Sequence, residues 1–134
     1  MTAVGSFWGS GTSVAAGAAA PLTTAGSGNT AGAFTITANT VTVVQAGTYL
    51  LTYSAAIGSG NAVLQLVVNS NLVPGTLGGT SSSGTRMLSG SAAVTLTANS
   101  TVLVRNVLAT AVTLSGVLGT QTPTSVSLSI LRVG

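Results

Sequence analysis

The sequence consists of short segments in which apolar and small polar side chains alternate with a period of two residues, separated by Gly, Pro and Asn. In SAAVTLTA, residues 91–98, one parity carries Ala92, Val94, Leu96 and Ala98, and the other carries mostly Ser and Thr. This alternation is typical of a strand with one buried face, and no segment keeps a helical repeat for more than a turn. The chain is therefore predicted to be all-β.

Segments of this kind recur at even spacing, which is typical of a sandwich or barrel of short strands. A length of 134 residues suits one domain with a sizeable core, so residues 1–134 are predicted to form a single domain. The expected strands cover residues 3–8, 19–23, 33–38, 41–45, 48–57, 62–69, 71–74, 86–97, 101–109, 111–118 and 125–133.

Two segments carry apolar side chains on both strand faces. In NAVLQLVVN, residues 61–69, both parities are largely apolar, and near the end of the chain Leu131 and Val133 add apolar side chains to a polar face. A single sheet packed on a single core does not use both faces. A second apolar surface is therefore expected.

Changes in the alternation mark turns. Its phase switches from even to odd across Asn39 and Thr40, where we expect a turn or bulge, and Gly47 is expected at a corner. One internal echo, TITANTVTVV at 35–44 against TLTANSTVLV at 95–104, predicts two similar strand–turn–strand corners. A single echo is too sparse for a repeat protein.

Charge is almost absent, because the sequence contains no Asp, Glu, His or Lys and its net charge of +3 comes from three arginines. Dispersed arginines do not form the cation cluster that nucleic acids require, so no nucleic-acid partner is expected. The usual metal ligands and most general acids and bases are missing, and no Cys is present. Tyr49 and Tyr53 remain as proton carriers, but packing suits them better than catalysis. We expect a non-enzyme without cofactor.

Two further expectations follow from composition. No run of about 18 apolar residues occurs, so no membrane insertion is expected. Because no side chain titrates between about pH 4 and pH 9, stability should not vary with pH across that range.

The three arginines have no side-chain carboxylate to pair with anywhere in the sequence. Arg105 and Arg132 fall within predicted strands, so we expect them to bond to main-chain carbonyls, stack on an aromatic ring or meet the terminal carboxylate. Arg86 follows a Gly/Ser loop, where it is either solvated or able to capture a ligand anion.

The segments QAGTYLLTYSAAI, AVLQLVVNSNLVPGT, STVLVRNVL and TSVSLSILRVG give the chain a family resemblance. It resembles the C-terminal domain of the BclA-type collagen-like glycoproteins of the Bacillus spore exosporium, from about Phe7 to Val133. The resemblance implies a complement/tumour-necrosis-factor-like jelly roll of about ten short antiparallel strands. It also implies that Val67 to Thr76 forms a hairpin with Asn69-Ser70-Asn71 in its turn.

Members of that family form threefold heads at the end of a collagen-like stalk. The resemblance therefore implies a homotrimeric structural head on a spore surface or filament tip, outside the cell. The sequence lacks a Gly-X-Y stalk and an exosporium-targeting segment. The candidate residues of the trimer interface are Phe7, Trp8, Tyr49, Tyr53, Leu131 and Val133.

A second hypothesis is a receptor-binding or carbohydrate-binding trimeric tip, like that of a phage fibre or lectin. Its partner would be a surface glycan or a host receptor. The candidate contacts are the predicted loop residues Asn61, Arg86 and Asn106.

Overall fold

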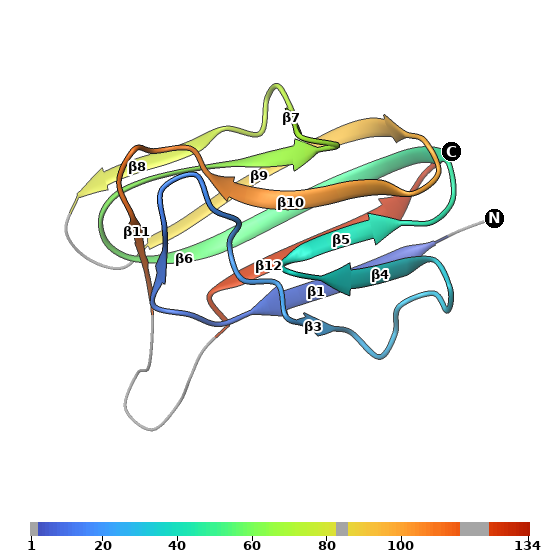
Figure 1. The fold of residues 1–134 in the computed structure, drawn as a ribbon, viewed down its shortest axis with the longest axis horizontal. Helices are drawn as coiled ribbons and strands as arrows, with labels where there is room; N and C mark the ends of the chain where they lie inside the picture. The colour runs from blue at the N-terminus through green and yellow to red at the C-terminus, as the bar shows by residue number, and fades with distance from the viewer. Residues whose placement is uncertain (1–2, 83–85, 116–123) are drawn as a thin grey trace.

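The computed structural model describes residues 3–82, 86–115 and 124–134 (Figure 1). These residues contain strands and turns but no helix, as predicted. The strands are β1 (Val4–Gly9), β2 (Ser13–Val14), β3 (Thr24–Ala25), β4 (Phe34–Thr37), β5 (Thr40–Val43), β6 (Gly47–Val68), β7 (Asn71–Leu72), β8 (Gly78–Ser82), β9 (Arg86–Leu96), β10 (Ser100–Asn106), β11 (Val112–Leu114) and β12 (Val126–Arg132).

The strands form two antiparallel layers that share β6. The first sheet has the order β3-β1-β12-β6-β9, and it uses residues 47–57 of β6. The second sheet contains β4, β5, β10 and residues 60–68 of β6, whose other edge pairs with β7 and β8. Short β11 pairs with both β2 and β6 beside the first sheet. Apolar side chains from both layers fill the space between them.

β6 runs the length of the sandwich in one layer, turns at one end and returns in the other layer (Figure 1). The predicted break at 58–61 is wrong, because the strand is continuous from Gly47 to Val68. Two glycines allow the turn. Gly60 has a φ of +75°, and a side chain at Gly58 would place its Cβ 2.8 Å from the Leu114 oxygen.

Two hairpins have two-residue turns with positive φ, the geometry that matches the twist of antiparallel strands. Ala38 and Asn39, with φ of 52° and 61°, join β4 to β5, which confirms the turn expected at the phase switch. Asn69 and Ser70, with φ of 49° and 69°, join β6 to β7, which confirms the hairpin in the VNSNLVPGT segment. The second turn is one residue shorter than expected, because Asn71 already pairs with Val68.

The two similar segments, residues 35–44 and 95–104, share only part of their structure. Asn39 and Asn99 occupy equivalent places and both have positive φ, 61° and 63°. However, the first turn closes a hairpin within the second sheet, whereas the second connects β9 in the first sheet to β10 in the second. The prediction of two similar corners therefore holds for the turn residue and is wrong for the topology.

One other strand prediction is wrong, and one strand was not predicted. Residues 19–23 make only an isolated bridge, between Ala19 and Arg105, and the local strands are β2 and β3 instead. β8 was not predicted, because GGTSS has no apolar alternation; its partner, the second half of β6, imposes the extended conformation.

Tyr53 joins the VPGT segment to the core. Its buried hydroxyl shares its single proton between two carbonyl oxygens, those of Leu64 at 3.0 Å and Thr76 at 2.7 Å. The Thr76 hydroxyl donates to the Val73 oxygen at 2.8 Å and accepts from the Leu66 amide at 3.1 Å. These bonds fix the chain after the hairpin against β6, which explains why Thr follows Pro-Gly at this point.

Burial raises the pKa of the Tyr53 hydroxyl above its ordinary value of 10.0, and the Gly78 backbone offsets part of that rise. In the unfolded chain this hydroxyl ionises near its ordinary pKa, while the folded protein still holds the proton. Above that pH, only the unfolded state releases its proton, so the free energy of unfolding decreases as pH rises.

We predict a melting temperature that is nearly constant between about pH 4 and pH 9 and decreases above about pH 10. The Tyr53→Phe variant should melt at a lower temperature at neutral pH, because two buried carbonyls lose their donor, and should show a smaller alkaline decrease. Tyr49→Phe is the matched control, since the Tyr49 hydroxyl bonds only the Gln45 oxygen, and it should keep the alkaline decrease. Calorimetry across this pH range measures all three; an equal alkaline slope in Tyr53→Phe would contradict the assignment.

Candidate functional site

The face of the first sheet that points away from the core is the candidate site, and we call it the outward face. It consists of the alternate residues of β1, β12, β6 and β9 whose strand neighbours are turned toward the core. The members of the outward face are Val4, Ser6, Trp8, Ser127, Ser129, Leu131, Leu50, Thr52, Ser54, Ala56, Met87, Ser89, Ser91, Ala93 and Thr95. None of these side chains is charged, and only Trp8 is larger than methionine.

Strand register assembles one apolar row across this face. Val4 lies opposite Leu131, Leu131 opposite Leu50, and Leu50 opposite Ala93, so four strands contribute one residue each. Val4, Leu131 and Leu50 are 41%, 38% and 39% exposed. We call these four residues the apolar row. Val133, 57% exposed, follows Leu131 by two residues and extends the apolar surface toward the chain end.

Two successive rows on one side of the apolar row carry hydroxyl groups at every position except Trp8. Ser6, Ser129, Thr52 and Ser91 form the first, and Trp8, Ser127, Ser54 and Ser89 form the second. In the second row the Ser54 and Ser127 hydroxyls lie 2.7 Å apart, so they bond each other across the strands. With neighbouring strands about 4.8 Å apart, four strands make a surface roughly 15 Å wide. Small side chains keep that surface even.

The predicted interface residues divide into two groups. Trp8, half-buried, and Leu131 lie on the outward face, and Val133 is exposed beside it. Phe7, Tyr49 and Tyr53 are corrected: each is no more than 1% exposed and packs in the core of the single chain.

Those three aromatic side chains have no free surface to offer a neighbouring subunit. Val4 and Leu50, which were not predicted as interface residues, also lie on the outward face. The sequence does show that Leu50 lies on the opposite face of its strand from Tyr49 and Leu51. It does not show which residues of other strands lie beside Leu50, because that depends on the register between distant strands.

Asn106 is corrected as a ligand contact, because its side chain is fully buried. Its amide nitrogen lies 3.1, 3.2 and 2.9 Å from the carbonyl oxygens of Val14, Ala15 and Thr110. Its amide oxygen accepts from the Leu108 main chain at 2.9 Å. Asn106 therefore holds the segment before β3 and the turn after β10 together.

The other two predicted ligand contacts lie in different sheets. Asn61 is exposed and pairs with β8 in the second sheet, whereas Arg86 is half-buried and pairs with Ile57 in the first. Neither shares a surface with buried Asn106. The geometry does not assemble the three side chains into one site.

Arg132 meets the expectation of a bond to the chain terminus and adds a side-chain partner that was not expected. Its Nε donates to the Gly134 main-chain oxygen at 3.3 Å, and its Nη1 donates to the Gln45 side-chain oxygen at 3.4 Å. Gly47 lies directly beneath, where a Cβ would be 2.5 Å from the Arg132 Nε. Gly47 is thus required for the close approach of Arg132 to the start of β6.

Across the described residues no ligand-sized cavity is present, and no helix there could cross a membrane. The same part of the chain holds no cluster of metal-binding side chains.

Several solved structures share this arrangement at low sequence identity. The Eiger TNF of S. frugiperda matches with a TM-score of 0.77 and 16% identity, covering 99% of this chain and 93% of that one. Murine APRIL, crystallised at pH 8.5, matches with a TM-score of 0.69 and 10% identity, covering 99% and 100%. The globular domain of the zebrafish complement 1qA protein matches with a TM-score of 0.63 and 16% identity, covering 97% and 92%.

The fold is a jelly roll of the tumour-necrosis-factor and complement type. The predicted fold class is confirmed by these structures. No protein-family description and no curated protein sequence matches the chain. The narrower resemblance to exosporium glycoproteins stays a prediction.

We predict that Asn106→Ala lowers the free energy of unfolding by about 2–4 kcal/mol, because several buried main-chain groups lose their partner at once. Asn61→Ala is the matched control: the same atoms are removed from an exposed position, and the change should stay within about 0.5 kcal/mol. Urea denaturation followed by circular dichroism measures both. Equal effects of the two substitutions would contradict the structural role of Asn106.

Proposed function

We propose that this chain is a non-enzymatic structural head that assembles as a homotrimer through the outward face of the first sheet. The observation that carries the proposal is the apolar row, in which Val4, Leu131 and Leu50 each remain about two-fifths exposed on adjacent strands. Side chains of this kind stabilise a folded chain only when another surface covers them.

The chemistry of the outward face suits identical copies. It carries no charge, so copies meet there without repulsion, and its Ser and Thr hydroxyls are both donors and acceptors that a second copy of the same face satisfies. Threefold assembly is implied by the resemblance to exosporium head domains, and the tumour-necrosis-factor-like fold agrees with it.

A non-enzymatic role is supported by the side chains that are present. Of the side-chain types that commonly act as general acids or bases, the sequence contains only tyrosine, at Tyr49 and Tyr53. Both hydroxyls donate to main-chain oxygens inside the fold. The solved structures compared above, a TNF, APRIL and a complement protein, carry no enzyme name, which agrees with a non-enzymatic role.

We propose further that the head lies outside the cell, at the tip of a collagen-like filament on a bacterial spore. Its support is the family resemblance, together with the position of the start of β1 beside the end of β12 at one end of the sandwich (Figure 1). A stalk joined at that end would leave the opposite end free. The alternative of a receptor-binding or glycan-binding tip is weaker, because buried Asn106 is removed from its candidate contacts.

We predict that light scattering of a dilute sample gives three times the 12.8 kDa subunit mass. Leu50→Asp should raise the concentration at which the trimer dissociates by about a hundredfold or more, since each buried, unpaired carboxylate costs several kcal/mol. Leu72→Asp is the matched control, because Leu72 is 49% exposed but lies in β7 of the second sheet.

A monomeric wild-type protein would contradict the trimer. Equal dissociation of Leu50→Asp and Leu72→Asp would contradict the assignment of the interface to the first sheet. Circular dichroism of each variant establishes that the subunit remains folded.

The location is tested separately. We predict that antibodies against this domain label the surface of intact spores of the organism that encodes it, and that collagenase releases the labelled domain. Labelling confined to the interior of vegetative cells would contradict the proposed location and leave the assembly result unaffected.

A further inference from the structure

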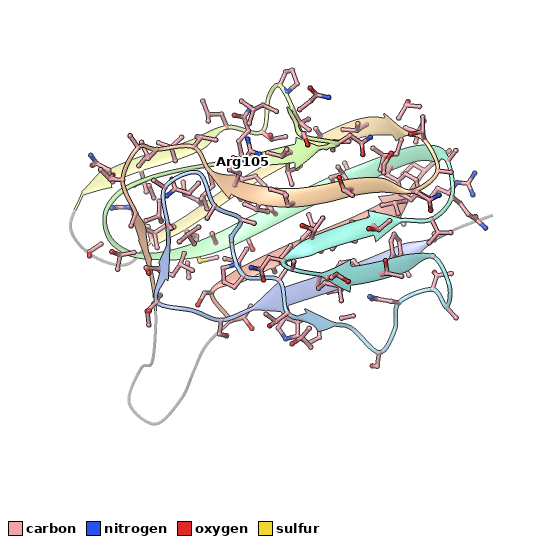
Figure 2. All side chains as sticks on the ribbon, in the orientation of Figure 1. Arg105 is labelled. Atoms are coloured by element: carbon pink, nitrogen blue, oxygen red, sulfur yellow. The ribbon has the colours of Figure 1, made fainter. Side chains whose placement is uncertain are left out.

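Arg105 lies near the end of β10, the central strand of the second sheet, on the side that faces away from the core. Its strand neighbours Val104 and Asn106 are fully buried, so the half-buried Arg105 side chain points outward. It lies opposite Gln65 in β6 on one side and forms a bridge with Ala19 on the other. Figure 2 shows Arg105 close to the end of β10. Paired on both sides, this backbone position is rigid.

In the described part of the chain, the guanidinium of Arg105 has no anionic partner. Within residues 3–82, 86–115 and 124–134, nothing forms a hydrogen bond or ion pair with its side chain. The sequence contains no Asp or Glu, so no further copy of the chain can supply a side-chain carboxylate either. An anionic partner for Arg105 must therefore come from a different molecule.

The surroundings of Arg105 are apolar along the strand direction. The row formed by Arg105 and Gln65 lies between two others, Leu103 with Val67 and Val107 with Val63. Gln65 is itself held in place, because its amide nitrogen donates to the Val73 oxygen at 3.0 Å. Val67 is buried within the chain, whereas Leu103, Val63 and Val107 are partly exposed. These three apolar neighbours exclude water from a bound partner and so strengthen a charge-assisted hydrogen bond.

We propose that this part of the second sheet, with Arg105 at its centre, binds a partner protein that presents an Asp or Glu carboxylate between apolar side chains. A guanidinium forms paired hydrogen bonds with a carboxylate, and arginine flanked by apolar contacts is typical of protein interfaces. The site lies on the sheet opposite the outward face, so it does not depend on the proposed trimer.

A polyanion fits this surface less well. Nucleic acids and anionic membranes are bound by several cations together. The other two arginines pair within the first sheet, Arg86 opposite Ile57 and Arg132 opposite Tyr49, and so do not join Arg105. A single guanidinium among apolar side chains recognises one carboxylate.

The test uses the fact that the sequence has three arginines, so the side-chain Nε–H groups give at most three signals in a nitrogen–proton correlation spectrum. The probe is the peptide acetyl-Leu-Glu-Leu-amide, titrated into the whole protein. We expect a saturable shift of the Arg105 signal, accompanied by shifts of Leu103 and Val107. The matched peptide acetyl-Leu-Gln-Leu-amide should bind about fivefold more weakly, which corresponds to the upper end of the range for an exposed ion pair.

Two variants complete the test. Arg105→Gln should abolish the preference for the Glu peptide while leaving the backbone spectrum unchanged, whereas Arg86→Gln should keep it. Equal shifts with the Glu and Gln peptides, or equal shifts of all three arginine signals, would overturn the proposal. If inorganic phosphate shifts the Arg105 signal at a lower concentration than the Glu peptide does, the proposal is overturned in favour of a phosphate-bearing ligand.

Discussion

The burial of apolar side chains between two sheets is the interaction on which this structure depends. A chain without Asp or Glu cannot form ion pairs between side chains, so cohesion comes from the packed interior and from main-chain hydrogen bonds. Leu51 and Ile57 of the first sheet and Leu64 and Leu66 of the second are wholly buried, and all four belong to β6. One strand therefore contributes to both halves of the core and holds the layers in register.

The local features of the fold could be read from the sequence because they depend on neighbouring residues. Alternation of period two places β9 correctly, with Ala92, Val94 and Leu96 turned toward the interior. The turns at Asn39 and Asn69 follow from residues that tolerate positive φ between two apolar runs. In each case the physical cause, a half-buried strand or a tight turn, is complete within about ten residues.

Features that depend on distant contacts could not be read in this way. The glycines in IGSGN indicate a break, yet β6 continues because strands on both sheets pair with it through the corner. Alternation also shows that Tyr49 and Tyr53 are buried without showing whether the core or a partner buries them, so they were assigned to an interface. Asn106 has the composition of a surface loop residue, and only the three carbonyls around its amide reveal its structural role.

The buried polar side chains whose partners the structure describes form hydrogen bonds within the fold. They are therefore not available to bind a ligand. Tyr53, Thr76 and Asn106 use their polar atoms to fasten loops to strands, so they stabilise the fold and have little left to offer a ligand. Recognition is left to the two outer sheet surfaces.

Those two surfaces differ in charge, and the difference decides which of them copies of the chain can share. Contact through the second sheet would bring the Arg105 guanidiniums of two copies together with no side-chain carboxylate to neutralise them. Two such charges about 8 Å apart at a protein surface repel by about 2 kcal/mol, which opposes a contact of modest area. The outward face of the first sheet carries no charge and exposes the apolar row. Self-association is therefore favoured on the first sheet, while the second remains suited to a partner of opposite charge.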